Sequence, residues 1–186
     1  LKEPVTESTK KAARCFYALE QNRADQKRYP AVNPIDSYSK YLEYPEIREH
    51  LSEKVKPGWV EMVEKTKNII RKGKDANDQI NILGDDGVPM SYHELFWKSE
   101  LVDFVILQQD AFDAIDALCP IERQSYMLEL VLGICDKEFK FEDYEQCRNF
   151  FKEVINTLRQ MNYSEFKSEK FENYKQQLTN LLSNGN

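Results

Sequence analysis

Glycine and proline are scarce in this sequence, with six glycines and seven prolines among 186 residues. Because both residues interrupt regular structure, their scarcity argues against a β-sandwich, a β-barrel or a collagen-like chain. No apolar run approaches the roughly 20 residues that cross a bilayer, and no signal peptide is recognisable, so we expect no membrane insertion. The formal net charge of −6 argues against a nucleic-acid partner, since phosphate contacts need a basic surface.

Cysteines and catalytic motifs are sparse as well. The four cysteines lie far apart, without a C-x-x-C pair or a nearby histidine: Cys15, Cys119, Cys135 and Cys147. We therefore expect no zinc site and no disulfide framework, but four reduced thiols that are mostly buried. The sequence also lacks G-x-x-x-x-G-K-[ST], G-x-G-x-x-G, H-E-x-x-H and G-x-S-x-G, so we assign no catalytic residue and no metal site.

Apolar residues recur with helical spacing from residue 34 onward, and hydrophobic residues make up 41% of the chain. The predicted helices cover residues 34–42, 59–73 and 91–106, a segment after Pro120, and residues 141–161 and 171–182. Ser91 and Glu94 have the spacing of a capping box, and Asn184 with Gly185 is expected to end the last helix. The sequence therefore predicts an all-α fold, a helical bundle of five or six helices.

Residues 1–33 differ from the remainder. The short apolar run R-C-F-Y-A-L at residues 14–19 is typical of a strand, but no second strand with clear alternation follows it. Since one strand cannot form a sheet, we expect its partners outside this chain. We therefore divide the chain into a short, non-autonomous N-terminal arm at residues 1–33 and a helical domain at residues 34–186.

Two segments carry the most specific pattern. Residues 28–39 are R-Y-P-A-V-N-P-I-D-S-Y-S, and residues 107–116 are L-Q-Q-D-A-F-D-A-I-D. In this order and at this separation they resemble the catalytic A subunit of V-type and A-type (vacuolar and archaeal) rotary ATPases. Residues 3–19 are similar to that family's E-P-V-T…F-W-A-L-D stretch, and C-P-I-E-R-Q at residues 119–124 is similar to its C-P-P-E-K-Q.

The resemblance implies that residues 1–33 are the tail end of a nucleotide-binding domain and that the helical part is the C-terminal domain. Tyr29 and Phe112 match aromatic positions of the family's adenine pocket, where rings stack on the base. Gln109 is expected near the base. ATP or ADP with Mg²⁺ is the implied cofactor of the full-length subunit. None is expected in this fragment, which lacks the phosphate loop and should not hydrolyse ATP by itself.

The loop G-D-D-G-V-P at residues 84–89 falls where the family's C-terminal domain reaches the central stalk. Asp85 and Asp86 are the predicted rotor contacts, although the family often has G-P-D-A-L-P there. The resemblance implies regulatory B subunits and central-stalk rotor subunits as partners, and a cytoplasmic location peripheral to the membrane. The bundle would be the lever that couples ATP hydrolysis or synthesis to rotation and to proton or sodium transport.

Two alternatives remain open. A stand-alone helical protein-interaction domain without enzymatic activity would need Phe16 and Tyr17 to be buried within this chain. A helical enzyme with a carboxylate site at Asp113 and Asp116 has less support, because acids three residues apart on a predicted helix usually form a solvated face. Without the resemblance, Phe112 would be interpreted as a core residue.

Overall fold

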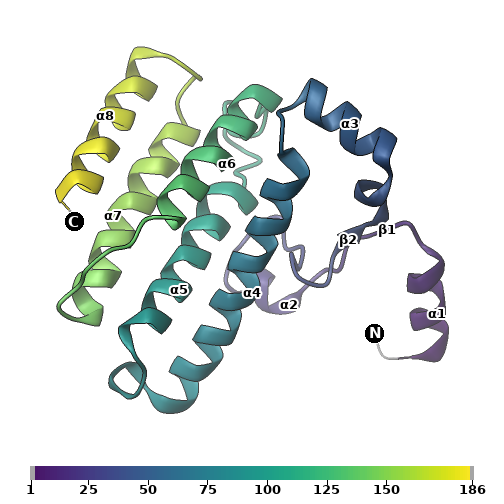
Figure 1. The fold of residues 1–186 in the computed structure, drawn as a ribbon, viewed down its shortest axis with the longest axis horizontal. Helices are drawn as coiled ribbons and strands as arrows, with labels where there is room; N and C mark the ends of the chain where they lie inside the picture. Colours follow the sequence, from purple (N-terminus) through teal and green to yellow (C-terminus); the bar gives the residue numbers. More distant parts are fainter. Residues whose placement is uncertain (1–2, 185–186) are drawn as a thin grey trace. The chain divides into compact units, whose positions relative to one another are not determined.

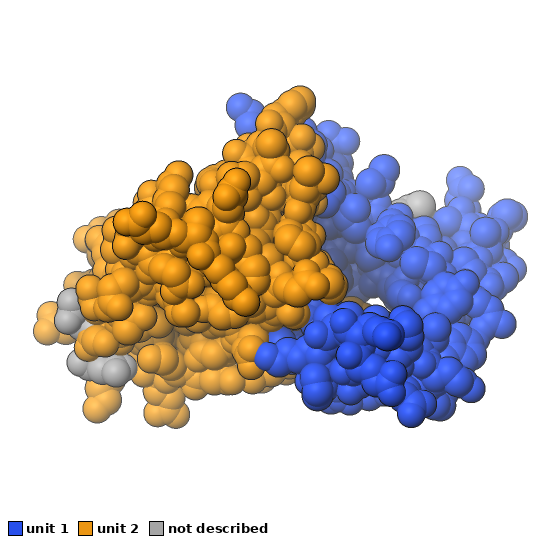
Figure 2. Space-filling model, turned by 90° about the horizontal axis from the view of Figure 1, so that it is seen from above, with its two compact units in different colours: residues 1–64 blue, residues 65–186 orange. Residues whose placement is uncertain are grey.

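The computed structural model describes residues 3–184 of the chain (Figure 1). The chain divides into two compact units, residues 1–64 and residues 65–186, which Figure 2 colours separately. The predicted boundary between residues 33 and 34 concerns a different division, between two parts of a longer subunit, and stays a prediction.

The first unit combines short helices with a small antiparallel sheet. Its elements are α1 (Pro4–Ala12), β1 (Cys15–Phe16), α2 (Gln21–Asp25), β2 (Tyr38–Ser39), the 3₁₀-helix η1 (Lys40–Glu43) and α3 (Pro45–Lys54). Helix α4 (Trp59–Leu83) begins in this unit and ends in the second. Helices α1 and α3 both begin at a proline, where the missing N–H has no helical partner to lose.

The expectation that the strand near residue 15 pairs outside the chain is wrong. Strand β1 pairs antiparallel with β2, so that Cys15 lies opposite Ser39 and Phe16 lies opposite Tyr38. The rings of Phe16 and Tyr38 pack with their centroids 5.9 Å apart, and the Tyr38 hydroxyl donates a hydrogen bond to the carbonyl of Lys10. The arm therefore finds its sheet partner in residues that directly follow it.

The helix predicted at residues 34–42 is wrong for a related reason. The side-chain oxygen of Asn33 accepts hydrogen bonds from the backbone N–H groups of Ile35 and Asp36, at 2.8 and 2.9 Å. Such a side-chain acceptor competes with the helical hydrogen-bond ladder and turns the backbone locally. The chain then extends into β2, where pairing with β1 overrides the helical spacing of the apolar residues.

The second unit is a helical bundle, in which α5, α6, α7 and α8 lie beside one another in Figure 1. After α4 its elements are the 3₁₀-helix η2 (Asp85–Gly87), α5 (Met90–Val102), the π-helix η3 (Asp103–Leu107), α6 (Ile121–Cys135), α7 (Tyr144–Asn162) and α8 (Glu169–Asn184). From residue 34 to the end of the described chain there are six α-helices, which confirms the predicted fold. Gly185, part of the predicted helix stop, lies outside the described residues.

The core of the second unit is built on one apolar face of α7, the helix predicted at residues 141–161. Phe151, Val154 and Leu158 of this helix are fully buried. Phe151 also joins an aromatic cluster whose ring centroids lie 4.9–6.1 Å apart, formed with Phe139, Phe141 and Phe150. Each fully buried phenylalanine contributes about 1.5–3 kcal/mol to folding. No helix within residues 3–184 is sufficiently long and apolar to cross a membrane.

A local capping motif sets the first residue of α7 but not that of α5. Asp143 caps α7, because its side-chain oxygen accepts the N–H of Gln146 at 2.8 Å. The capping box predicted at Ser91 is wrong: α5 begins at Met90, and Pro89 occupies the N-cap without a side-chain hydrogen bond. The start at Met90 leaves the Ser91 hydroxyl inside the first turn, where it cannot cap.

All four cysteines are free thiols. Cys147 is buried, and burial raises the pKa of its thiol to about 12. Burial likewise raises the pKa of the Cys135 thiol to about 12. Cys15 is exposed, and Cys119 and Cys135 are partly exposed, so the expectation of mostly buried thiols is wrong.

Gly73 marks a close approach between α4 and α5. A Cβ atom at this position would lie 2.0 Å from the Cβ and 2.5 Å from the Oγ of Ser99. Gly133, on α6, has no heavy atom within 4 Å of a Cβ placed there. The two glycines therefore form a matched pair, one at a helix contact and one facing open space.

We expect Gly73→Ala to lower the free energy of unfolding by about 1–3 kcal/mol, because the added methyl group forces the two helices apart. Gly133→Ala should leave stability unchanged or raise it by up to about 1 kcal/mol through helix propensity. Urea denaturation followed by circular dichroism measures both. Equal stability of the two variants would contradict the close approach.

Candidate functional site

Tyr29 lies in the first unit, at the turn between two paired stretches of backbone. The N–H of Glu20 donates to the carbonyl of Ala31 at 3.0 Å, and the N–H of Asn33 donates to the carbonyl of Ala18 at 2.7 Å. These bonds hold residues 31–33, which follow Tyr29 closely, against the segment that precedes α2. Tyr29 itself is 54% exposed.

Phe112 lies in the second unit, on the loop of residues 108–120 between η3 and α6. This loop consists of turns and has no regular helix or strand. The Phe112 side chain is fully exposed, at 101%, and Leu118 on the same loop is 78% exposed. The interpretation of Phe112 as a core residue is therefore wrong.

Three aspartates organise this loop by accepting hydrogen bonds from its backbone. Asp110 Oδ1 accepts the N–H of Phe112 at 2.9 Å, and Asp113 Oδ1 accepts the N–H groups of Ile115 and Asp116 at 2.9 and 2.8 Å. Asp116 Oδ2 in turn accepts the N–H of Asp110 at 2.7 Å. The carboxylates thus replace the backbone ladder that a helix or strand would supply.

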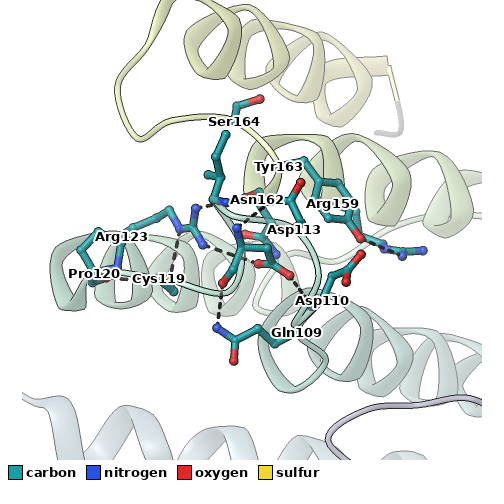
Figure 3. A network of polar contacts seen from close by, with 12 residues as sticks. Gln109, Asp110, Asp113, Cys119, Pro120, Arg123, Arg159, Asn162, Tyr163 and Ser164 are labelled. Carbon is teal, nitrogen blue, oxygen red and sulfur yellow. Dashed lines mark hydrogen bonds and ion pairs between the residues drawn. The ribbon is translucent and has the colours of Figure 1, made fainter.

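The Arg123 guanidinium connects the loop to the helices (Figure 3). It is 1% exposed and donates to Asp116 Oδ1 at 3.5 Å and to Cys119 Sγ at 3.3 Å. It also donates to the backbone carbonyl of Asn162, at the end of α7, at 3.0 Å. One buried side chain therefore contacts two points of the loop and the terminus of another helix.

The charge of Asp116 is set by this environment. Burial raises the pKa of its carboxyl, and the neighbouring Asp113 and Asp110 act in the same direction. The hydrogen bond from the Asp110 N–H and the positive charge of Arg123 oppose this rise in the pKa. The expectation that Asp113 and Asp116 form a solvated helical face is wrong, because they lie in turns and Asp116 is only 7% exposed.

Gln109 precedes these aspartates, and its side chain is directed back to the loop. Its Nε2 donates a hydrogen bond to the carbonyl of Asp116 at 2.7 Å (Figure 3). The structure thus brings Gln109 and Phe112 together on one loop. Tyr29 belongs to the other unit, so the predicted adenine pocket as a whole stays a prediction.

Asp85 and Asp86 lie on the 3₁₀-helix η2, which follows Gly84 with its positive φ of 79°. Both aspartates are exposed. The backbone carbonyl of Asp85 accepts a hydrogen bond from Nε2 of His93, at 2.9 Å. His93 is 4% exposed and stacks on Tyr144 with ring centroids 5.6 Å apart, so it fixes the turn to the starts of α5 and α7.

Sequence reasoning missed Arg123, Asn162 and His93 as members of these two regions. A signal existed for Arg123, because it shares the helical spacing of Met127 and Val131, which are both buried. An arginine on an apolar helix face needs a buried partner. The partner itself could not be identified, because helical spacing says nothing about a neighbouring loop.

Known proteins agree on one family. Residues 48–151 match the family described as the C-terminal domain of V and A type ATP synthase. The V-type ATP synthase alpha chain of Chlamydia abortus is 37% identical over 180 residues, and that of Chlamydia pneumoniae is 38% identical over 180 residues. Both matches cover 97% of this chain and 30% of the relative, so the chain spans less than a third of these proteins.

A solved structure described as a unique ATP synthase subunit NeqB from Nanoarcheaum equitans has a similar fold, with a TM-score of 0.54. It is 18% identical, and the match covers 72% of this chain and 31% of that chain. At this level of identity the likeness concerns the fold alone. It is consistent with the helical bundle described above.

We expect His93→Ala to lower the free energy of unfolding by about 1–3 kcal/mol, because a buried ring and its hydrogen bond to Asp85 are lost. Amide exchange should also accelerate at Gly87, whose N–H is bonded within the turn to Gly84. His50 is exposed, so His50→Ala is the matched control and should change stability by less than about 0.5 kcal/mol. Unchanged exchange at Gly87 in His93→Ala would contradict the anchoring of η2.

Proposed function

The chain belongs to the family of C-terminal domains of V- and A-type ATP synthases, and we propose that it forms this domain in the catalytic chain of a rotary ATPase. The helical bundle and the order of the motifs at residues 28–39 and 107–116 support the proposal. The proposed activity of the complete subunit is ATP hydrolysis or synthesis coupled to ion transport. Tyr17 is 72% exposed, which argues against the stand-alone interaction domain.

The exposed ring of Phe112 is the observation that carries the proposal. The Phe112 ring is 101% exposed, so folding of this chain buries none of its apolar surface. Stacking against the face of a purine would bury that surface. We propose that Phe112 and Tyr29 contact the adenine of ATP or ADP and that Gln109 lies near the base. Tyr29, at 54% exposure, also retains an accessible ring face.

The phosphate end of the nucleotide is assigned to other parts of the complete subunit. Within residues 3–184, no group of three or more His, Cys, Asp or Glu side chains is placed to hold a metal ion. Phosphoryl transfer depends on groups that position and neutralise the phosphates, and this sequence has no phosphate loop.

The turn η2 is the proposed contact with the rotor. Asp85 and Asp86 are exposed there, and the exposed apolar side chains of Ile82 and Leu83 lie just before Gly84, at the end of α4. A lever requires contacts that differ between the rotary states, since only differential contacts shift a conformational equilibrium. The proposed partners are the regulatory B subunits and the central-stalk subunits, in a cytoplasmic complex peripheral to the membrane.

We expect Phe112→Ala, in the complete subunit assembled in its ATPase, to raise the KM for ATP by about 2- to 12-fold. This factor corresponds to the loss of about 0.5–1.5 kcal/mol of ring stacking. The kcat should stay within about twofold, because the adenine contact stabilises the bound substrate and the transition state equally. Steady-state hydrolysis over a range of ATP concentrations measures both constants.

Leu118→Ala is the matched control, since it removes another exposed apolar side chain from the same loop. Phe112→Tyr should keep the KM of the unchanged enzyme, because the ring remains. Tyr29→Ala should raise the KM as Phe112→Ala does, with Tyr17→Ala as its control. An unchanged KM in both alanine variants of the pocket would refute the adenine contact.

We expect the purified 186-residue chain alone to show no ATP turnover, because it has no phosphate loop. The measurement is steady-state phosphate release in the presence of Mg²⁺ and ATP. The Gly133→Ala variant, purified in the same way, controls for a contaminating ATPase, because a contaminant's activity would vary between preparations rather than with this chain. Reproducible ATP turnover that co-purifies with both chains would contradict the expected inactivity of this chain alone.

A further inference from the structure

The position of the Phe112 ring depends on the backbone beneath it. Because the side chain is fully exposed, packing inside this chain does not hold the ring in place. The surrounding loop, residues 108–120, also lacks the hydrogen-bond ladder of a helix or strand. Whatever orders this loop therefore decides where the ring is presented.

Within the loop, order comes from the three aspartates, and Asp116 is the one that is buried. Asp110 accepts the backbone N–H of Phe112 itself, and Asp113 accepts the N–H groups of Ile115 and Asp116 that follow it, at 2.8–2.9 Å. Asp116 closes the arrangement by accepting the N–H of Asp110 at 2.7 Å. A buried carboxylate is costly unless it is paired, so a cation beside Asp116 stabilises this closure of the loop.

Arg123 is that cation, and its guanidinium also contacts groups other than Asp116. Its Nη2 donates to Asp116, its Nε donates to Cys119 at the end of the loop, and its Nη1 donates to the Asn162 carbonyl. The Asn162 side chain then donates to the carbonyl of Val105 at 2.8 Å, in the π-helix that leads into the loop. The contacts thus join both sides of the loop to the end of α7.

We propose that Arg123 is a positioning residue for the nucleotide: it fixes loop 108–120 to α7 and η3, and thereby sets the place of the Phe112 ring. This inference rests on the proposed adenine contact of Phe112. A guanidinium suits the task because its planar N–H groups point in different directions and reach three acceptors at once. The loop then moves with the helices as one body, so that a shift of the bundle displaces the ring.

The test compares Arg123→Gln with Arg159→Gln in the complete subunit assembled in its ATPase. Arg159 is an exposed arginine of α7 whose guanidinium donates to the Tyr163 hydroxyl and lies 5.9 Å from the ring centre of Phe104 in η3. It serves as the control for loss of an arginine from the same region, because its hydrogen bond goes to α7's own end rather than to residues 108–120. Hydrogen exchange reports the order of residues 108–120, and steady-state hydrolysis gives the KM for ATP and the kcat.

In Arg123→Gln we expect amide exchange of Phe112 and Asp116 to accelerate by about tenfold or more, while α5 stays protected. The KM for ATP should rise by about 2- to 12-fold, as for Phe112→Ala, and the kcat should stay within about twofold. Combining Arg123→Gln with Phe112→Ala should add little to either single effect on the KM, since both act through one ring. Arg159→Gln should change neither the exchange nor the KM.

Two further variants keep the test decisive if Arg123→Gln does not fold. Arg123→Lys keeps the charge beside Asp116 but cannot reach three acceptors, so it should loosen the loop while the bundle stays folded. Arg123→Gln with Asp116→Asn removes both charges, and it should fold with a loosened loop and a raised KM.

The outcomes separate this inference from the proposed function. If Phe112→Ala raises the KM and the folded Arg123 variants do not, the positioning role is wrong and the adenine contact stands. If Phe112→Ala leaves the KM unchanged, the adenine contact fails, and the positioning role for the nucleotide fails with it. Unchanged amide exchange in the loop of the Arg123 variants overturns the anchoring itself.

Discussion

The ion pair between Arg123 and Asp116 is the constraint on which the exposed loop depends. Both residues are buried, and removal of one partner from a buried pair costs about 3–5 kcal/mol. The intact pair contributes much less net stability, because desolvation offsets most of the attraction. What the pair adds is connection: the same guanidinium contacts Asp116, Cys119 and the backbone carbonyl of Asn162, and so joins the loop to the end of α7.

Helical spacing predicted the bundle well because burial on one face is a local property of the sequence. Phe151, Val154 and Leu158 show the apolar face of α7 directly, and the structure buries all three. The same spacing failed at residues 34–42, because β1 and the side chain of Asn33 provide hydrogen bonds that compete with a helix. The two paired strands lie more than 20 residues apart, so the spacing of apolar residues within either segment does not reveal the pairing.

The candidate site divides in the same way. Phe112, Gln109 and Tyr29 could be proposed from ordered motifs, whereas the partners of Arg123 and the part played by Asn162 could not. Their contacts cross from α6 to the loop and to the end of α7, and such contacts depend on how helices pack. The contact at Gly73 was equally hidden, since a glycine within a helix is indistinguishable in sequence from Gly133, which faces open space.

The π-helix η3 determines the direction in which the loop leaves the bundle. Its wider turn, closed by the bond from the Gln108 N–H to the Asp103 carbonyl at 2.9 Å, spans one residue more than an α-helical turn. An α-helical residue advances by about 100° around the axis, so the wider winding rotates the exit of the chain by up to roughly that angle. An uninterrupted α-helix over the same residues would send the Phe112 ring toward a different side of the domain.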